Sequence, residues 1–410
     1  MRRREFNYLI VVIVLLTTQR VLQDYSKILI LALAIIAFLF FITHVITGCK
    51  NYDFNNIDRE NRFIIFLLLL ISLSIPIRSL IEIDNWSVST AARLFVNSLA
   101  IMPYCLPLLA LHAIYKVNLR LMVIISSVLA VLYVLVALTN ISDLSQLRNL
   151  GLAHYQSYGG VSGYSAKSYY VYTFLSMFAA PQVVFLLKRY IPNKHWRLSC
   201  ISIVSFFLVS LLLARRTSIF CTLLIFIASY YIIFKKNKKV VFFAVPCIIG
   251  CVAIFAYFGG FDFIISRFDS NTRESVEVAF YNDLDCNLLL FGRGALGTYY
   301  DPGFAHDGMT GHRDVIETGY LNHILKGGVF YLFVYVYVLL KSWYLGYYKS
   351  NNVLSKVFSV NALINCISLI PHGVPHFNLA YCFLWIGVGV CLNSKVRRMS
   401  DVEIQNYLWK

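Results

Sequence analysis

Long blocks of apolar residues constrain the fold of this chain more than any other feature. The block ILILALAIIAFLFFITHVIT at 28–47 contains no acidic residue, lysine or arginine, and it has the roughly 20 residues that a helix needs to cross a bilayer. Over all 410 residues, 59% are hydrophobic and 14% are charged, whereas soluble domains are about a quarter charged. We therefore predict an all-α, polytopic integral membrane protein whose solvent is mainly the lipid bilayer.

Twelve apolar blocks predict about twelve transmembrane helices. They fall at 6–22, 28–47, 63–83, 91–115, 119–139, 169–190, 197–214, 217–234, 240–260, 318–340, 353–371 and 377–393. Basic clusters such as KKNKK at 235–239 all lie in inner connections if the N-terminus is inside, as the positive-inside rule requires. Both termini are therefore expected in the cytoplasm.

Between the ninth and tenth predicted helices lies the longest outer connection, which contains no lysine. Its arginines are Arg267, Arg273, Arg293 and Arg313. The periodic stretch RESVEVAFYNDL argues against disorder, so we expect a structured cap on the outer face. The predicted organisation is nine helices in 1–260, the large loop in 261–317, and three helices with a cytoplasmic tail in 318–410.

Charge and cysteine usage exclude several classes of protein. The net charge of +16 could suit a nucleic-acid binder, but the basic residues form short clusters between apolar blocks, as membrane topology signals do. The ten cysteines are scattered, without a CxxC pair or a His/Cys cluster at metal-ligand spacing. We therefore predict no nucleic-acid partner, no cofactor and no metal.

Two weaker patterns could suggest a metal. Asp283 and Asp285 form a DxD, which soluble sugar-nucleotide transferases use to hold a divalent metal, but the acidic loop makes this pair easy to obtain by chance. His372 and His376 are four residues apart, but prolines flank them and disrupt the helix that such a zinc site needs. We interpret the two histidines as part of an outer turn.

Arg215 and Arg216 form the only break between the seventh and eighth predicted helices, and the topology places them on the outer face. They oppose the positive-inside bias, so something must compensate for them. One interpretation is a tight turn whose arginines reach lipid headgroups. The other is that a guanidinium points into an outer cavity as a bidentate phosphate ligand.

Two further motifs follow in the loop. LLLFGRGALG at 288–297 is a glycine-rich turn around Arg293 without the context of a nucleotide-binding fold. GHRDVIETGYLNHILKGG at 311–328 gathers His312, Arg313, Glu317 and His323 at the start of the tenth predicted helix. If that helix begins near Asp314, Glu317 and His323 lie on different sides, so only one of them can line a cavity.

In this order, the motifs resemble those of the Wzy-type polysaccharide polymerases and the related O-antigen ligases, bacterial membrane glycosyltransferases of the GT-C type. An outward arginine after a mid-chain helix matches Arg215 or Arg216, and the family's "sgR" matches SNTR ending at Arg273. Its "llGxGxg" matches LLLFGRGALG, and its "HN.yL..l...G" matches ETGYLNHILKGG. The resemblance covers about 205–345.

One departure distinguishes the two groups. Glu317 and Thr318 stand where the ligases carry histidine and asparagine, and an acid at this place resembles the polymerases. The resemblance therefore favours a polymerase over a ligase. A flippase of lipid-linked oligosaccharides stays a third alternative, although flippases have two similar halves and rarely one long outer loop.

The resemblance implies an undecaprenyl-diphosphate-linked oligosaccharide as substrate, on the periplasmic face of a bacterial inner membrane, with a chain-length regulator as a further partner. Arginines would stabilise the leaving diphosphate without a metal, and an acid or histidine would deprotonate the acceptor hydroxyl. The predicted catalytic residues are Glu317, His312 and Arg215. The predicted diphosphate and sugar ligands are Arg216, Arg273, Arg293, Arg313, His323 and Tyr320.

Overall fold

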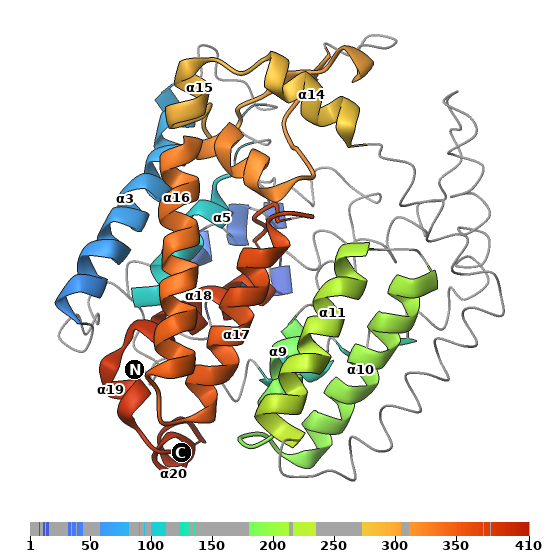
Figure 1. Ribbon diagram of the computed structural model, residues 1–410, viewed down its shortest axis with the longest axis vertical. Coiled ribbons are helices and arrows are strands. Elements are labelled where there is room, and N and C mark those ends of the chain that lie inside the picture. Colours follow the sequence, from blue (N-terminus) through green and yellow to red (C-terminus); the bar gives the residue numbers. More distant parts are fainter. Residues whose placement is uncertain are drawn as a thin grey trace. The chain divides into compact units, whose positions relative to one another are not determined.

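The computed structural model describes most of the C-terminal third of the chain and separate stretches before it. The described residues are 58–81, 100–111, 180–212, 216–234, 273–304, 311–371, 373–377 and 379–409, with isolated positions between 8 and 43, at 90 and 94, and between 123 and 135. The chain divides into two compact units, Met1–Leu119 with Thr272–Lys410, and Arg120–Asn271. Helices dominate the described residues of both units (Figure 1).

The first unit contains the longest of the described helices and most of the large loop. Its elements are α3 (Arg59–Ile81), α5 (Met102–Cys105), the 3-10 helix η2 (Leu106–Leu111), α14 (Glu274–Asn282), α15 (Cys286–Phe291), β1 (Tyr299–Tyr300), the 3-10 helix η5 (Pro302–Phe304), β2 (His312–Arg313), α16 (Gly319–Tyr348), α17 (Val353–Ser368), α18 (Leu379–Leu392), α19 (Ser394–Arg398) and α20 (Asp401–Trp409). The two short strands pair antiparallel, with Tyr299 opposite Arg313.

The second unit is a smaller helical bundle. It contains α9 (Ala180–Leu186), α10 (Asn193–Leu212), α11 (Arg216–Ser229) and the π-helical turn η4 (Tyr230–Phe234). Between α9 and α10, the indole Nε1 of Trp196 donates to the carbonyl of Phe185 over 3.1 Å. The Lys188 ammonium lies 4.1 Å from the centre of the Trp196 ring, so this connection is held by both a hydrogen bond and a cation–π contact.

Two of the described helices are long and apolar enough to cross a membrane, within Asn61–Ile81 and Gly319–Tyr348. Three further apolar helices are shorter, namely Thr217–Ile233, Val353–Ser368 and Leu379–Leu392. These five segments match predicted blocks, and the all-α prediction is confirmed for the described residues. The predicted ninth helix at 240–260 lies outside them.

A kink in α16 organises the loop above it. Gly328 lies inside the helix with φ 74°, and an added Cβ there would collide with the carbonyl of Leu290 at the end of α15. Carbonyls that the kink frees from the helix are satisfied by the GxG turn, because Arg293 N–H donates to Leu325 O over 2.7 Å and Gly294 N–H donates to Lys326 O over 3.0 Å. The glycine-rich segment is therefore a turn that seals a helix kink.

The described part of the large loop is folded, as the sequence predicted. Its core is an apolar cluster in which α14 and α15 bury side chains against the start of α16. The fully buried members include Phe280, Leu288, Tyr299, Ile316, Leu321 and Leu325. Phe280 packs edge-on against Tyr299, with ring centroids 5.8 Å apart. This cluster fixes α14 relative to the first turn of α16 and thereby positions the polar residues on its surface.

Candidate functional site

One face of α14 lies along the start of α16 and forms what we call the α14–α16 seam. It consists of Arg273, Glu277 and Tyr281 facing Glu317, Thr318 and Tyr320. The three residues on the α14 side are four apart in sequence, which places them on one face of a helix. Each contacts a different residue of the short stretch that leads into α16, so the seam is a row of three polar contacts.

At one end of the seam, Arg273 and Glu317 form an ion pair. Arg273 Nε lies 3.3 Å from Glu317 Oε2, and the side chains are 39% and 64% exposed. A second guanidinium nitrogen, Nη1, donates to the carbonyl of Pro371 over 2.5 Å. An ion pair this exposed contributes about 1 kcal/mol or less to stability. Both charged groups are therefore accessible to a ligand from solution.

The rest of the seam carries hydroxyl groups. Thr318 Oγ1 donates to Glu277 Oε1 over 2.5 Å, and the hydroxyls of Tyr281 and Tyr320 are 3.5 Å apart. The Tyr281 side chain is 50% exposed. Thr318 is the buried N-cap of α16, but its side chain makes no cap hydrogen bond. Its hydroxyl instead links α14 to α16.

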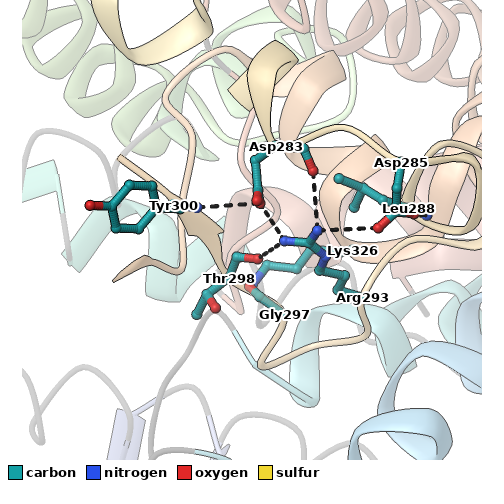
Figure 2. Close-up of polar contacts among 8 residues, drawn as sticks. All are labelled: Asp283, Asp285, Leu288, Arg293, Gly297, Thr298, Tyr300 and Lys326. Carbon is teal, nitrogen blue, oxygen red and sulfur yellow. Dashed lines mark hydrogen bonds and ion pairs between the residues drawn. The ribbon is translucent and has the colours of Figure 1, made fainter. Parts of the chain in front are cut away.

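A second polar group, which we call the Arg293 cluster, lies beside the GxG turn and has a different character (Figure 2). The guanidinium of Arg293 forms an ion pair with each carboxylate of the DxD, Asp283 and Asp285. It also donates to the carbonyls of Thr298 over 2.7 Å and Asp283 over 3.1 Å. The buried Lys326 completes the cluster, with Nζ 2.9 Å from the carbonyl oxygens of both Ala295 and Gly297.

The DxD therefore serves the local fold. Asp285 is the N-cap of α15 and accepts from Leu288 N–H over 2.7 Å. This backbone hydrogen bond, helped by Arg293, lowers the pKa of the Asp285 carboxyl below its usual 3.8. Asp283 also accepts from the backbone N–H of Tyr300 over 3.3 Å. Among the described residues, no three His, Cys, Asp or Glu side chains converge as metal ligands.

The remaining loop residues proposed for the site, Arg313 and His312, lie on β2 of the two-stranded sheet. Arg313 forms an ion pair over 3.1 Å with Asp301, the residue that follows β1. His312 is exposed on β2 and packs edge-on against Tyr300, with ring centroids 5.6 Å apart. The geometry favours a role for Arg313 in holding the sheet.

His323 is buried inside the bundle. Its side chain is 1% exposed, Nδ1 lies 2.7 Å from the carbonyl of Gly319, and the ring stacks on Tyr331 with centroids 5.4 Å apart. The helix begins at Gly319, one residue after the start of the predicted block at 318–340 and not at the alternative start near Asp314. Glu317 and His323 nevertheless differ as expected, since only Glu317 is exposed.

The second unit contributes less to this picture. Arg215 lies outside the described residues, and only the backbone of Arg216 is described, at the first position of α11. The prediction that one of them binds phosphate stays a prediction. His372 also lies outside the described residues.

Sequence reasoning missed Glu277 and Tyr281. The available signal was their spacing from Arg273, since 273, 277 and 281 repeat every four residues within a stretch already recognised as periodic. The sequence did not show that these side chains would face Thr318 and Tyr320. No family model, curated protein or solved structure matches this chain. We therefore infer the site from the residues of this chain alone.

Proposed function

We propose that this chain is a metal-independent membrane glycosyltransferase that polymerises undecaprenyl-diphosphate-linked oligosaccharide repeat units into a surface polysaccharide. In this proposal it has about twelve transmembrane helices and the GT-C type of fold, lies in a bacterial inner membrane, and works on the periplasmic face. The single observation that carries the proposal is the exposed Arg273–Glu317 pair at the start of an apolar helix of 30 residues. It combines a phosphate ligand and a proton acceptor within one contact.

The chemistry follows from that pairing. Glycosyl transfer forms a bond between the acceptor hydroxyl oxygen and the anomeric carbon of the donor, and breaks the bond from that carbon to the diphosphate. Arg273 offers a planar fork that fits two phosphate oxygens and stabilises the departing anion. Glu317 accepts the proton of the acceptor hydroxyl as general base. No nucleotide is needed, since the lipid diphosphate already activates the sugar.

The ion pair also links the two tasks. Without substrate, Arg273 Nε is occupied by Glu317 over 3.3 Å. A diphosphate carries more negative charge than one carboxylate and competes for the guanidinium. When Arg273 turns to the diphosphate, Glu317 loses its partner and is released to contact the acceptor hydroxyl. The base thus becomes available when the donor is in place.

The two ends of α16 support the proposed orientation. The seam lies at the Gly319 end, whereas the Tyr348 end carries exposed basic residues from the helix terminus and from the tail. These are Lys349, Lys395 and Arg398. Arg397 joins them to the bundle through an ion pair with Asp58 over 2.9 Å. Basic residues remain on the cytoplasmic side of a membrane, so the seam belongs on the opposite, periplasmic side.

The test is the surface polysaccharide of a strain that lacks this gene. Loss of a polymerase leaves chains with a single repeat unit on the surface, and the wild-type gene restores long chains. Polymer stranded on the lipid carrier would instead identify a ligase, and single units stranded on the cytoplasmic face would identify a flippase. Either result would overturn the proposal.

A further inference from the structure

The part of the seam that the proposed chemistry leaves unused has the composition of a sugar-binding surface. Glu277 is half-buried and accepts a hydrogen bond from Thr318, and Tyr281 is 50% exposed, with its hydroxyl 3.5 Å from that of Tyr320. Carboxylate oxygens accept strong hydrogen bonds from sugar hydroxyls. Exposed aromatic rings present a flat apolar face to the C–H groups of a sugar ring. Both groups project from the same face of α14 as Arg273.

We propose that Glu277 and Tyr281 form the subsite for the sugar ring next to the transferred bond, and that this subsite selects an uncharged sugar over an acidic one. This inference rests on the proposed function, since it names the substrate class of the same site. Glu277 determines the charge selectivity, and Tyr281 supplies the stacking surface.

The selectivity follows from the charges around the subsite. Carboxylates dominate there, because Glu277 and Glu317 belong to the seam and Glu274 is exposed on the preceding turn of the same helix. The one cation of the seam, Arg273, is bound to Glu317 and in the proposed reaction turns to the diphosphate. A uronic acid carboxylate would therefore meet only like charges at Glu277. Near water, repulsion at contact distance weakens binding about fivefold.

The tertiary contact of Glu277 can be kept without its negative charge. Its described side-chain contact is a hydrogen bond accepted from Thr318, and a glutamine at 277 has a carbonyl oxygen that accepts the same bond. The negative charge lies in the first turn of α14, where it adds a modest helix-dipole stabilisation, and the hydrogen bond to Thr318 does not need it. Glu277→Gln therefore separates the charge from the structural contact.

The experiment measures sugar binding by saturation-transfer NMR on the purified full chain in lipid nanodiscs. The probes are neutral methyl hexosides and the matched methyl hexuronides, which differ only in carrying a carboxylate at C6. We expect the wild type to favour the neutral member of each pair by about fivefold. Glu277→Gln should reduce that preference to near equality, and Tyr281→Ala should abolish binding of both members, while Tyr281→Phe should retain it.

Two matched controls keep the test specific. Glu274→Gln removes the same charge from a neighbouring, exposed position of α14 that does not belong to the seam, and because only Glu277 would touch the sugar, it should leave the preference within about twofold of the wild type. Tyr344→Ala removes a tyrosine of similar exposure, 47%, at the other end of α16 and should leave binding intact. Equal binding of both sugar classes by the wild type, no binding of either class, or an equal effect of Glu274→Gln and Glu277→Gln would overturn the inference.

The same probes distinguish failure of the subsite from failure of the proposed function, because binding does not require turnover. If the protein shows the expected sugar selectivity but does not elongate lipid-linked repeat units, the proposed subsite stands and the proposed polymerase function is wrong. If the protein polymerises but Glu277→Gln changes neither sugar binding nor sugar preference, the proposed polymerase function stands and the proposed subsite is wrong.

Discussion

The Arg293 cluster and the α14–α16 seam each place an arginine against acidic side chains in the same loop, but the two arginines are used differently. Arg293 contacts two carboxylates and two carbonyls, and it holds together the turn that seals the kink of α16. Arg273 contacts one exposed carboxylate and one carbonyl. An arginine whose donors are used by the fold stabilises structure, whereas one that can exchange an exposed partner is able to bind a ligand.

The largest expected effect concerns the acid of the seam. Glu317→Gln removes the proposed proton acceptor and should lower the proposed polymerisation rate by about 10² to 10⁴. The folded protein should lose about 1 kcal/mol or less, because the ion pair with Arg273 is exposed. The measurement is polymer length in cells together with the melting temperature of the purified protein, with Glu274→Gln as the control for removing a nearby charge. Normal polymer from the Glu317 variant would disprove the role of base.

The second expected effect concerns the kink beneath the Arg293 cluster. Gly328→Ala adds a Cβ at φ 74° that collides with Leu290, and left-handed strain plus overpacking should destabilise the fold by about 3 kcal/mol. Gly303→Ala is the control, since its Cβ would meet only the Asp301 carboxylate, at 3.3 Å. Membrane levels and melting temperatures should fall for the first variant alone. Equal behaviour of the two variants would show that the kink is dispensable.

Much of this contrast could not be predicted from the sequence. The length of the apolar blocks predicted α3 and α16 well, because a block of about 20 apolar residues can cross a bilayer only as a helix. The GxG motif predicted a tight turn, and Gly292 and Gly294 do have φ of 72°. It did not predict which carbonyls would accept hydrogen bonds from the turn. The carbonyls of Leu325 and Lys326 lie more than 30 residues further along the chain, and they become available only because α16 is kinked at Gly328.

The site was predicted in part for the same reason. Glu317, Tyr320 and Arg273 were named from motifs, and the structure brings all three to the seam. Arg293 was named from its motif too, but the sequence could not show that Asp283 and Asp285 would occupy its guanidinium. The helical tail, α19 and α20, was not predicted either, because its short segments lack the apolar length that identified the other helices.

The smallest expected effect is the pH dependence of the Arg293 cluster. The pKa of Asp285 is lower in the folded protein than its usual 3.8, so its carboxylate contributes stability above about pH 4, and this contribution is lost as the pH falls through the lowered pKa. Wild type should therefore melt slightly above Asp285→Asn near neutral pH, and the difference should shrink as the pH falls below 3.8 and vanish once the pH is below the lowered pKa of the folded state. A difference that persists in acid would show that the charge of Asp285 is not what matters.

The most direct test of the whole comparison replaces each arginine by lysine, which keeps the charge and loses the planar fork. For Arg273→Lys and Arg293→Lys, polymer length and melting temperature are measured side by side at matched protein levels in the membrane. Arg273→Lys should melt like the wild type but yield only single-repeat chains, with a rate lower by about 10² to 10³. Arg293→Lys should melt at a lower temperature, because its free energy of unfolding falls by about 1 to 3 kcal/mol. Each folded molecule should still make long polymer. Long polymer from Arg273→Lys, or single repeats from a fully stable Arg293→Lys, would contradict the division of labour between the two arginines.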